Sequence, residues 1–566
     1  MYTPDLAPLA GSLTLSSLIA VLPLLTIFLT LGALRWKAHW AGLSALAVAG
    51  LVAAIVYGMP VHLVALSASQ GFAFGLFPIM WIVLNAIWLY ELTVRSGRFE
   101  DLRLVIDTIS DDPRVQAIII AFCFGGLLEA LAGFGAPVAI TGVMLMAVGF
   151  TAMRAATVVL IANTAPVAFG AIAIPIITAG NLTGIPYQHI GAIIGHQAPF
   201  LAAMVPMFLV LLVDGRRGVR QLWPLALVVG LVFAVSQYVS SNFVSVELTD
   251  IIASLAGLGA AVLMLRVWTP DGGADALENM RRERESEQAD APREDAPQQD
   301  ASGGAVATRT RLSTALTPLR VFLALFPYLL VIVIFSASKL VPALNSFLAS
   351  TDLRIEWPGL HGNVRTAAGE LSTSTVYSFQ WLSSPGTLLL LTGIVVALVY
   401  RLSARDTVDV YVTTLVKMRW SILTVASVLA LAYVMNQSGQ TITIGTWIAG
   451  TGAAFAFLSP VLGWLGTAVT GSDTSANALF ATLQQTAAEE AGLDPALLVA
   501  ANTSGGVVGK MISPQNLTIA ATAVGLLGQE SAIFRRVIWW SLGMLLALCV
   551  LVGLQSSVLS WMIPSA

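Results

Sequence analysis

The chain has 566 residues, of which 57% are hydrophobic and only 10% are charged, and its mean hydropathy is +0.83. Soluble globular proteins carry about 25% charged residues, so this composition excludes a soluble globular chain and indicates a polytopic membrane protein. The formal net charge of −3 is uninformative for such a protein, and we expect no nucleic-acid partner.

Nearly uncharged runs of about twenty residues recur from one end of the chain to the other. They predict spanning α-helices, because lipid offers no partner to unpaired backbone groups and a β-barrel would need short alternating segments instead. The clearest runs are 13–33, 72–94, 188–213, 222–241, 248–267, 319–341, 443–465 and 537–560. We therefore expect an all-α polytopic membrane protein with about 12 to 14 spans in the lipid bilayer.

Lysine and arginine gather in clusters that alternate with loops lacking them. The basic clusters lie at 35–37, 95–114, 216–220, 266–320, 401–419 and 535–536, whereas 59–71, 181–188, 242–250 and 438–442 contain neither residue. Basic loops of membrane proteins stay in the cytoplasm. The pattern therefore predicts cytoplasmic basic loops, with the N- and C-termini both extracytoplasmic.

Two distant stretches of the chain repeat one pattern. Asn163-Thr164 is followed by a glycine and a proline, and Asn502-Thr503 is followed by the same two residue types at the same spacing. The charges that precede the two copies are opposite, Arg154 before the first and an acidic group around Glu489 before the second. Paired, interrupted hydrophobic segments of this kind are typical of secondary transporters with inverted-topology repeats and a substrate site between them.

These features predict a division of the chain into scaffold helices, two repeats and a linker. The expected order is N-terminal scaffold helices (1–71), a first inverted repeat with broken helices (72–213), scaffold helices (214–268), a disordered cytoplasmic linker (269–318), scaffold helices with an extracytoplasmic loop at 343–385 (319–419), and a second inverted repeat (420–560). The linker is expected to be disordered because it is highly charged and almost lacks large apolar side chains. Neither 129–150 nor 466–485 can be assigned as crossing or re-entering.

The first repeat contains a charged residue beside a helix break. Glu129 is followed by Gly133-Phe134-Gly135 and Pro137, which should interrupt the helix and leave backbone N–H groups facing a cavity that attracts anions. We expect Gly133, Phe134 and Gly135 to contact substrate. A buried carboxyl favours its protonated form, which suits a proton carrier, and the alternative is a neutral, hydrogen-bonded structural acid.

The second repeat contains the corresponding polar segment. Ser472, Asp473 and Thr474 stand in a run of small hydroxyl and amide side chains. Such residues cap a re-entrant helix or hold a small polar ligand. Asp473 is expected mainly as a cap or network residue, because an ionised aspartate repels an anion. Protonation would remove that repulsion and would couple proton binding to substrate binding.

Lys510 lies inside an apolar segment, where an unpaired charge costs on the order of 2.5 to 3.5 kcal/mol. We expect it to bind a substrate carboxylate or to form an ion pair with Asp473 or Glu129. Gln515 follows shortly after and adds an amide beside the break.

Asn163, Thr164, Asn502 and Thr503 are expected to line the site, the alternative being interhelical hydrogen bonds. His196 is a further proton-coupling candidate, because histidine titrates near neutral pH. Cys123 and Cys549 both fall in apolar segments, so we expect neither a disulfide nor a metal site. No cofactor is expected, since the sequence has no cysteine cluster and no paired histidines at haem-ligating spacing.

Four motifs together closely resemble the L-lactate permease family, and the likeness covers most of the chain. They are Leu128-Glu129 with 132–140 (AGFGAPVAI), 163–170 (NTAPVAFG), 470–475 (TGSDTS), and 500–503 (AANT) continuing through 509–515 (GKMISPQ). The resemblance implies a bacterial plasma (inner) membrane transporter that takes up L-lactate, and often glycolate, together with protons. It also implies a fold similar to inverted-repeat ion transporters with paired re-entrant hairpins.

The resulting hypothesis is proton-coupled symport of L-lactate and related 2-hydroxymonocarboxylates by alternating access, without enzymatic activity. One anion would bind near the bilayer midplane, with its charge balanced by a proton on Glu129 or Asp473. The alternatives are a sodium-coupled carboxylate transporter, a channel, and a membrane-embedded enzyme or respiratory subunit. The scaffold helices also offer contacts for a homo-oligomer.

Overall fold

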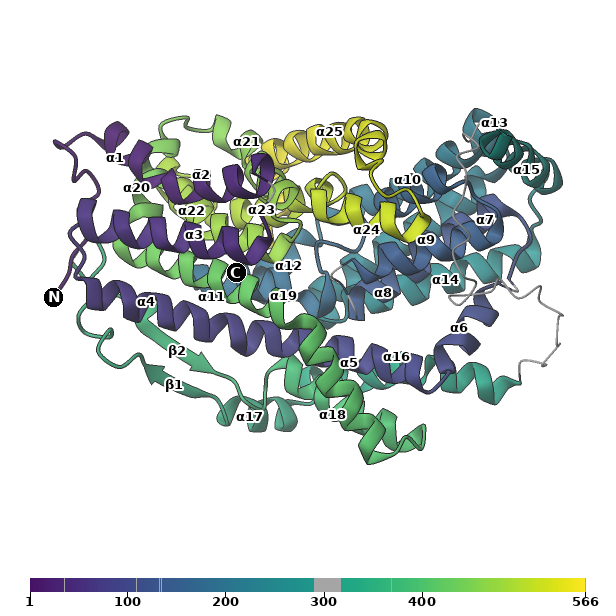
Figure 1. Ribbon diagram of the computed structural model, residues 1–566, viewed down its shortest axis with the longest axis horizontal. Helices are drawn as coiled ribbons and strands as arrows, with labels where there is room; N and C mark the ends of the chain where they lie inside the picture. Colours follow the sequence, from purple (N-terminus) through teal and green to yellow (C-terminus); the bar gives the residue numbers. More distant parts are fainter. Residues whose placement is uncertain are drawn as a thin grey trace, which may run out of the picture.

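The computed structural model describes residues 1–34, 36–107, 109–131, 133, 135–289, 317–367 and 369–564. These residues are predominantly helical, and their strands form one small two-stranded sheet (Figure 1). The prediction of an all-α polytopic membrane protein is confirmed.

Within the described residues, nine helical stretches are long and apolar enough to cross a membrane. They are Leu13–Leu31, Ala38–Val56, Val61–Arg95, Pro113–Leu131, Ala198–Val244, Thr249–Val267, Pro318–Ser338, Ala404–Ser438 and Glu530–Gln555. Five further apolar helices are shorter: Ala136–Val148, Ala152–Ala162, Ala171–Thr183, Pro385–Val399 and Ala454–Thr470. The short helices fall mainly in the two predicted repeats, where glycines and prolines interrupt the apolar runs.

The first part of the chain forms helices that pack against the C-terminal part. The elements are α1 (Leu13–Ala20), α2 (Leu22–Phe28), η1 (Leu29–Ala33), α3 (Ala38–Leu51), η2 (Val52–Val56), α4 (Val61–Phe74), η3 (Gly75–Met80), α5 (Trp81–Arg95) and α6 (Arg98–Asp107). Helix α1 packs on α20, and α3 and α4 pack on α19, so the first and last parts of the sequence form one side of the molecule (Figure 1).

The second part contains the first predicted repeat. Its elements are α7 (Pro113–Gln116), η4 (Ala117–Phe124), α8 (Gly125–Leu131), α9 (Ala136–Val148), α10 (Ala152–Ala162), η5 (Ala171–Ala173), α11 (Ile174–Thr183), α12 (Tyr187–Ile194), α13 (Ala198–Val239), η6 (Ser240–Val244) and α14 (Thr249–Val267). The predicted run 188–213 covers most of α12 and the first part of α13, and the run 222–241 covers the last part of α13. Between the two runs α13 is broken at Asp214 and Gly215, whose backbone angles are not helical.

The predicted linker is helical over its first part, which corrects the expectation of disorder there. Helix α15 (Gly273–Ala289) consists largely of alanine, glutamate and arginine, which are good helix formers. Arg154 of α10 forms a 2.8 Å ion pair with Glu283, and Arg217 of α13 pairs with Asp275. These contacts hold α15 against the helical body, whereas 290–316 lie outside the described residues.

The predicted extracytoplasmic loop at 343–385 is partly ordered. After α16 (Pro318–Leu340) come α17 (Pro342–Ser350), β1 (Leu353–Glu356), η7 (Thr373–Thr375) and β2 (Val376–Phe379), and α18 (Pro385–Val399) follows. Strands β1 and β2 pair antiparallel, with Leu353 opposite Phe379. Tyr2 bridges to Val364 of this loop, and its hydroxyl donates to the carbonyl of Ser438 at 2.9 Å. Three segments predicted to be extracytoplasmic therefore lie together.

The last part contains the second predicted repeat. Its elements are α19 (Ala404–Ser438), α20 (Gln440–Ala449), α21 (Ala454–Thr470), α22 (Asp473–Ala491), α23 (Pro495–Lys510), α24 (Pro514–Val524), α25 (Glu530–Gln555) and η8 (Ser560–Met562). Helices α21 and α23 pack closely, because Gly463 leaves room for the backbone carbonyl of Asn502. Small residues allow such close approach of helix backbones in membranes.

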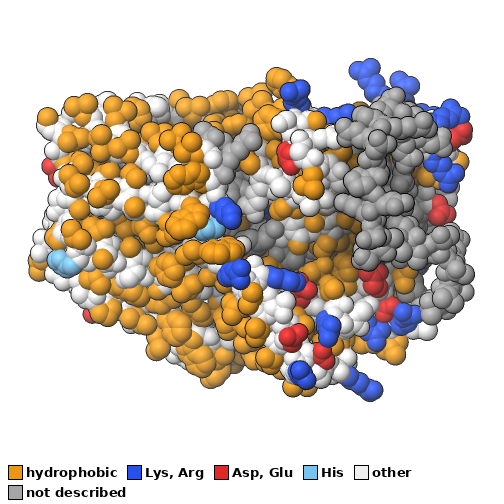
Figure 2. Space-filling model, viewed as in Figure 1, with side chains coloured by type: hydrophobic (Ala, Val, Ile, Leu, Met, Phe, Trp, Pro, Cys, Tyr) orange, Lys and Arg blue, Asp and Glu red, His pale blue; other side chains and the backbone are white. Residues whose placement is uncertain are grey.

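The two predicted repeats contain corresponding interruptions and pack reciprocally. Short non-helical segments separate α8 from α9 and α21 from α22, and further interruptions of the helix follow α10 and α23. Helix α9 packs on α24, and α11 packs on α22. Charged side chains on the face in Figure 2 gather toward the end of the molecule that carries α13 and α15, while the opposite half is mainly hydrophobic.

Candidate functional site

A buried ion pair joins the two predicted repeats. Glu129, near the end of α8, accepts a hydrogen bond at Oε1 from Nζ of Lys510, the last residue of α23, at 2.6 Å. The exposed fractions are 2% for Glu129 and 8% for Lys510. Asn163 donates from Nδ2 to the second oxygen, Glu129 Oε2, at 3.0 Å. Of the two protein side chains expected to pair with Lys510, Asp473 and Glu129, the ion pair in the structure is with Glu129.

The break after Glu129 depends on glycine. Gly133 and Gly135 have φ angles of 49° and 85°, a region that residues with a side chain rarely adopt. A Cβ at Gly135 would collide with Ile519 of α24, and one at Gly133 would lie 3.8 Å from Glu129 Oε1. The predicted interruption beside Glu129 is confirmed, while Phe134 lies outside the described residues.

The Asn163-Thr164 pair also stands at a break. Helix α10 ends at Ala162, and Thr164 donates through Oγ1 to the carbonyl of Ile161 at 2.6 Å. The chain then passes through Ile172 and Ala173, whose φ angles are 49° and 56°. Positive φ at a β-branched residue costs on the order of 1 to 3 kcal/mol and is concentrated at functional sites. The backbone is therefore strained in η5, between α10 and α11.

A narrow cavity lies beside the ion pair, and in this conformation it has no room for a water molecule. It is lined by Leu160, Asn163, Thr164, Val167, Val507, Lys510, Met511 and Asn516. One cation, two amides and one hydroxyl thus face four apolar side chains. This combination suits a small organic anion that carries both polar and apolar groups, since apolar walls with a few placed polar groups are typical of ligand sites.

In the second repeat, Ser472 and Asp473 have different roles. Ser472 is the N-cap of α22, with its Oγ accepting from the backbone N of Ser475 at 3.3 Å. Asp473 was expected as a cap or network residue; it is the first helical residue, so Ser472 caps the helix and Asp473 makes a network contact. Thr467 donates to Asp473 Oδ1 at 3.4 Å, while Oδ2 is buried with no hydrogen-bond partner among the described residues. Asp473 Oδ1 occupies the space where Gly506 of α23 lacks a side chain.

The remaining predicted residues of this break lie close by. Thr474 is buried on the first turn of α22. Gln515 is largely exposed and rests on Gly471, where its Oε1 would lie 2.5 Å from an added Cβ. Neither Thr474 nor Gln515 lines the cavity beside the ion pair.

The second Asn-Thr pair differs from the first. Asn502 and Thr503 lie within α23, and the break comes only after Lys510. Both donate to Asn477 Oδ1, at 2.9 Å and 3.0 Å, and Asn477 donates to the carbonyl of Pro175 at 3.2 Å. These bonds tie α23, α22 and α11 together and match the interhelical alternative.

His196 lies between α12 and α13, away from the ion pair. Its Nδ1 is 2.9 Å from the carbonyl of Ala192, and its ring packs edge-on against Tyr238 with the centroids 4.9 Å apart. The adjacent Gln197 is the residue that reaches α23, where it accepts from Ser504 Oγ at 2.6 Å. The structure thus does not bring His196 to Glu129 or Lys510 through any described hydrogen bond.

Sequence reasoning missed three residues of this region. Asn516 lines the cavity and donates to the carbonyl of Lys510 at 3.1 Å. Asp250 and Gln237, from α14 and α13, form a buried pair with Gln237 Nε2 3.1 Å from Asp250 Oδ1. The available signal was an acid two residues inside the apolar run 248–267. Asp250 was overlooked because 242–250 was interpreted as an extracytoplasmic loop without lysine or arginine.

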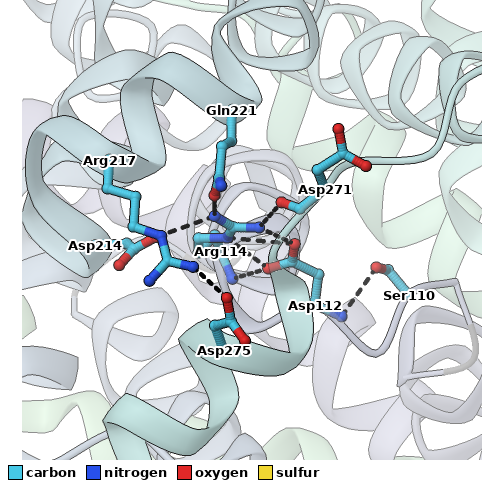
Figure 3. A network of polar contacts seen from close by, with 8 residues as sticks. All are labelled: Ser110, Asp112, Arg114, Asp214, Arg217, Gln221, Asp271 and Asp275. Carbon is cyan, nitrogen blue, oxygen red and sulfur yellow. Dashed lines mark hydrogen bonds and ion pairs between the residues drawn. The ribbon is translucent and has the colours of Figure 1, made fainter.

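A separate polar cluster surrounds Arg114, whose side chain is fully buried. Figure 3 shows its guanidinium between Asp112, Asp214 and Gln221, and it also donates to the carbonyl of Asp271. The cluster connects the start of α7 with the kink of α13 and the segment before α15. Because every group in it is paired, we interpret it as structural.

Comparisons with known proteins agree on one family. A family model described as L-lactate permease matches residues 16–559. The chain is 40% identical to the L-lactate permease of Bacillus subtilis (strain 168), over the full length of both chains. It is 41% identical to the glycolate permease GlcA of Escherichia coli (strain K12), covering 100% of this chain and 99% of the relative, and 40% identical to the L-lactate permease of the same organism, covering 98% of each.

Proposed function

The chain belongs to the L-lactate permease family, and we propose that it is a proton-coupled symporter for L-lactate and related 2-hydroxymonocarboxylates such as glycolate. Its site is the cavity bounded by Asn163, Lys510 and Asn516. The observation that carries the proposal is the buried Glu129–Lys510 pair at 2.6 Å beside that cavity.

The ion pair supplies a mechanism for coupling. The cavity must widen to admit a substrate, whose carboxylate then competes with Glu129 for Lys510. Once displaced, an ionised Glu129 would be a buried charge without a counterion, which costs several kcal/mol. Glu129 therefore takes up a proton as the substrate binds, and the site gains one anion and one proton together. A neutral load also avoids about 2.3 kcal/mol per charge for each 100 mV of membrane potential.

The cavity lining supports a short hydroxy acid as the substrate. The carboxylate binds Lys510, while Asn163, Thr164 and Asn516 offer donors and acceptors to the hydroxyl group. The apolar side chains of Val167 and Val507 face the carbon chain. A missing methyl group changes binding by only about 1 to 3 kcal/mol, so one such site accepts both lactate and glycolate.

Alternating access would use the two predicted repeats. The reciprocal packing of α9 on α24 and of α11 on α22 is what an inverted-topology pair with internal two-fold symmetry would produce, and it supports that proposal. Because Glu129 belongs to one repeat and Lys510 to the other, breaking the ion pair releases a direct contact between them. Substrate binding is thereby linked to relative movement of the repeats.

We place the protein in the bacterial plasma membrane with both termini extracytoplasmic and the 269–318 linker cytoplasmic. Support comes from the grouping of Tyr2, the 343–385 loop and the turn at Ser438 in one region. The test uses a chain that lacks Cys123 and Cys549 and a thiol reagent that does not cross the membrane of intact cells. We expect the reagent to label Thr373→Cys and not Arg281→Cys. The reverse pattern would invert this topology.

Substrate specificity is tested by counterflow. Purified protein is reconstituted with unlabelled L-lactate inside the vesicles, and uptake of labelled L-lactate is measured at equal pH on both sides. Competition by glycolate, weaker competition by acetate, which lacks the hydroxyl group, and no competition by neutral lactamide are expected. Absence of exchange with any hydroxy acid would overturn the proposed function.

Sodium coupling is the closest alternative, since Asp473 has one oxygen with no hydrogen-bond partner among the described residues. Counterflow does not distinguish the coupling ion. Uptake driven by a pH gradient in sodium-free buffer does, and a strict sodium requirement would favour the alternative.

A further inference from the structure

Asp250 is a buried acid that the mechanism above does not use. It lies at the start of α14, and only 1% of its surface is exposed. Its Oδ1 accepts a hydrogen bond from Gln237 Nε2 at 3.1 Å. Its second oxygen, Oδ2, is buried and has no hydrogen-bond partner among the described residues.

Two further buried polar atoms near Asp250 have no hydrogen-bond partner among the described residues either. Gln237 Oε1 and Ser254 Oγ, one helical turn along α14, also lack partners within the described part of the chain. More than about 90% of buried polar groups in proteins are satisfied, so three unsatisfied atoms in one place need an explanation. An ionised Asp250 would add only acceptors, whereas a protonated Asp250 provides an O–H donor to a group that lacks donors.

Two charged groups act on Asp250 from other helices. They are Lys510 of α23 and Glu129 of α8, whose charges have opposite effects on it. Lys510 is engaged by Glu129 at 2.6 Å, so one cation already balances one carboxylate. A second carboxylate in the same buried region would be uncompensated, which is costly in a membrane interior.

Helix α14, which begins near Asp250, packs against α8, which carries Glu129. Gly126 of α8 leaves room for Ser254, whose Oγ would lie 2.6 Å from an added Cβ. Cys123 meets Gly257 and Gly126 meets Ser254, so the two segments run antiparallel. One further turn in the same spatial direction leads from Gly126 to Glu129 on α8 and from Ser254 to Asp250 on α14. Gln237 Nε2 also donates to the carbonyl of Ala165 at 3.0 Å, so the Asp250 pair is tied to the chain segment of Asn163.

The outer side of Asp250 is polar as well. Glu247, three residues earlier, is buried and accepts from Tyr187 at 2.7 Å and from Ser245 at 2.7 Å. Both Glu247 and Tyr187 belong to segments predicted to be extracytoplasmic. Toward the other end of α14, the titratable Cys123 of η4 faces Gly257, about two turns away.

We propose that Asp250 is a proton-binding site that supplies the proton taken up by Glu129. In the empty site Asp250 is protonated and Glu129 is ionised. When the substrate carboxylate displaces Glu129 from Lys510, the proton passes from Asp250 to Glu129, and Asp250 is reprotonated from the extracytoplasmic side past Glu247. One proton is thereby taken up for each anion. The inference rests on the proposed symport.

The transport test compares Asp250→Asn with the exposed control Asp275→Asn. Asp275→Asn should behave like the wild type. Asp250→Asn should keep lactate counterflow within about threefold, because exchange moves no net proton, and should lose the tenfold accumulation per pH unit expected for one proton per anion. Asp250→Glu should recover part of it. Unchanged pH-driven accumulation in Asp250→Asn would overturn the assignment.

An infrared measurement tests the same assignment without transport. Protein labelled with ¹³C in its aspartate carboxyl groups should show an isotope-shifted C=O band of a protonated acid near neutral pH. The band should persist in Asp473→Asn and disappear when Asp250→Asn is added to that variant, since the other buried aspartates among the described residues, Asp101 and Asp112, pair with arginine. If Asp250→Asn fails to fold, the Asp473→Asn spectrum decides alone, and absence of the band overturns the proposal.

The two proposals fail in different ways. A wild-type protein that exchanges lactate but never accumulates it under a pH gradient overturns proton symport and, with it, the role of Asp250. A wild-type protein that couples transport to protons, together with an Asp250→Asn variant that couples equally well, overturns the role of Asp250 only.

Discussion

Glu129 Oε1 and Lys510 Nζ lie 2.6 Å apart although 381 residues separate them in the sequence. The contact connects the break after α8 with the end of α23, and thus the first predicted repeat with the second. Both side chains are almost fully buried. Their charges are therefore available only to each other and to whatever enters the adjacent cavity.

Replacement of Glu129 by glutamine should uncouple transport from protons. Glutamine has a similar size but cannot take up a proton, so Lys510 is left free to bind the substrate anion. We expect Glu129→Gln to lose the tenfold accumulation per pH unit while keeping lactate counterflow. The control is Glu490→Gln, on the exposed end of α22. Full accumulation by Glu129→Gln would remove Glu129 from the mechanism.

Replacement of Lys510 by methionine should damage both binding and stability. The substrate loses its cation, so the concentration needed for half-maximal counterflow should rise at least tenfold. Removing one partner of a buried ion pair typically costs about 3 to 5 kcal/mol, and removing both partners is much less costly. The double variant Glu129→Gln/Lys510→Met should therefore recover thermal stability but not lactate affinity. If the single variant matches the wild type in both measurements, the pair has neither role.

Much of the fold was predictable from the sequence because lipid imposes strict rules. Long uncharged runs require helices, and the glycines at Gly133 and Gly135 mark a break that the structure contains. The linker was the exception. Composition predicted disorder over 269–318, yet α15 forms because Asp275 and Glu283 find arginine partners on α13 and α10, and such long-range pairs are invisible to local composition.

The charged residues of the site could be predicted from the sequence, but the contacts between them could not. Isolated charges in apolar segments identified Glu129, Lys510 and Asp473, since each needs a partner or a function. The sequence left three partners open for Lys510, and only the three-dimensional structure shows that its Nζ lies 2.6 Å from Glu129 Oε1. The repeated Asn-Thr motif suggested equivalent roles, but Asn163 stands at a helix end and contacts Glu129, whereas Asn502 lies inside a helix and bonds to Asn477.

A methyl group at Gly463 should destabilise the protein. A Cβ there would collide with the backbone carbonyl of Asn502 and force α21 away from α23. Overpacking of this kind costs about 1 to 3 kcal/mol, so Gly463→Ala should lower the unfolding temperature in detergent. Gly543→Ala is the matched control, because its Cβ meets no atom within 4 Å and alanine favours the helix. Equal unfolding temperatures for the two variants would contradict the proposed packing.

The Arg114 cluster in Figure 3 should be required for stability. Alanine at this position would leave Asp112 and Asp214 as buried carboxylates without their cation, at a cost of about 3 to 5 kcal/mol. Thermal unfolding and the yield of folded protein report this loss. Arg282→Ala removes an exposed pair on α15 and should change neither quantity. A stable Arg114→Ala variant would mean that the two aspartates are protonated or hydrated instead.

Proton coupling through the Glu129–Lys510 site is tested most directly by the pH inside dye-loaded, sodium-free proteoliposomes when L-lactate is added outside. With the membrane potential clamped, wild-type protein should acidify the interior in a saturable manner, well above the leak of undissociated lactic acid into protein-free liposomes. Glu129→Gln should reduce the signal to that leak. Acidification no greater than the leak for the wild type, in a preparation that performs counterflow, would contradict proton symport.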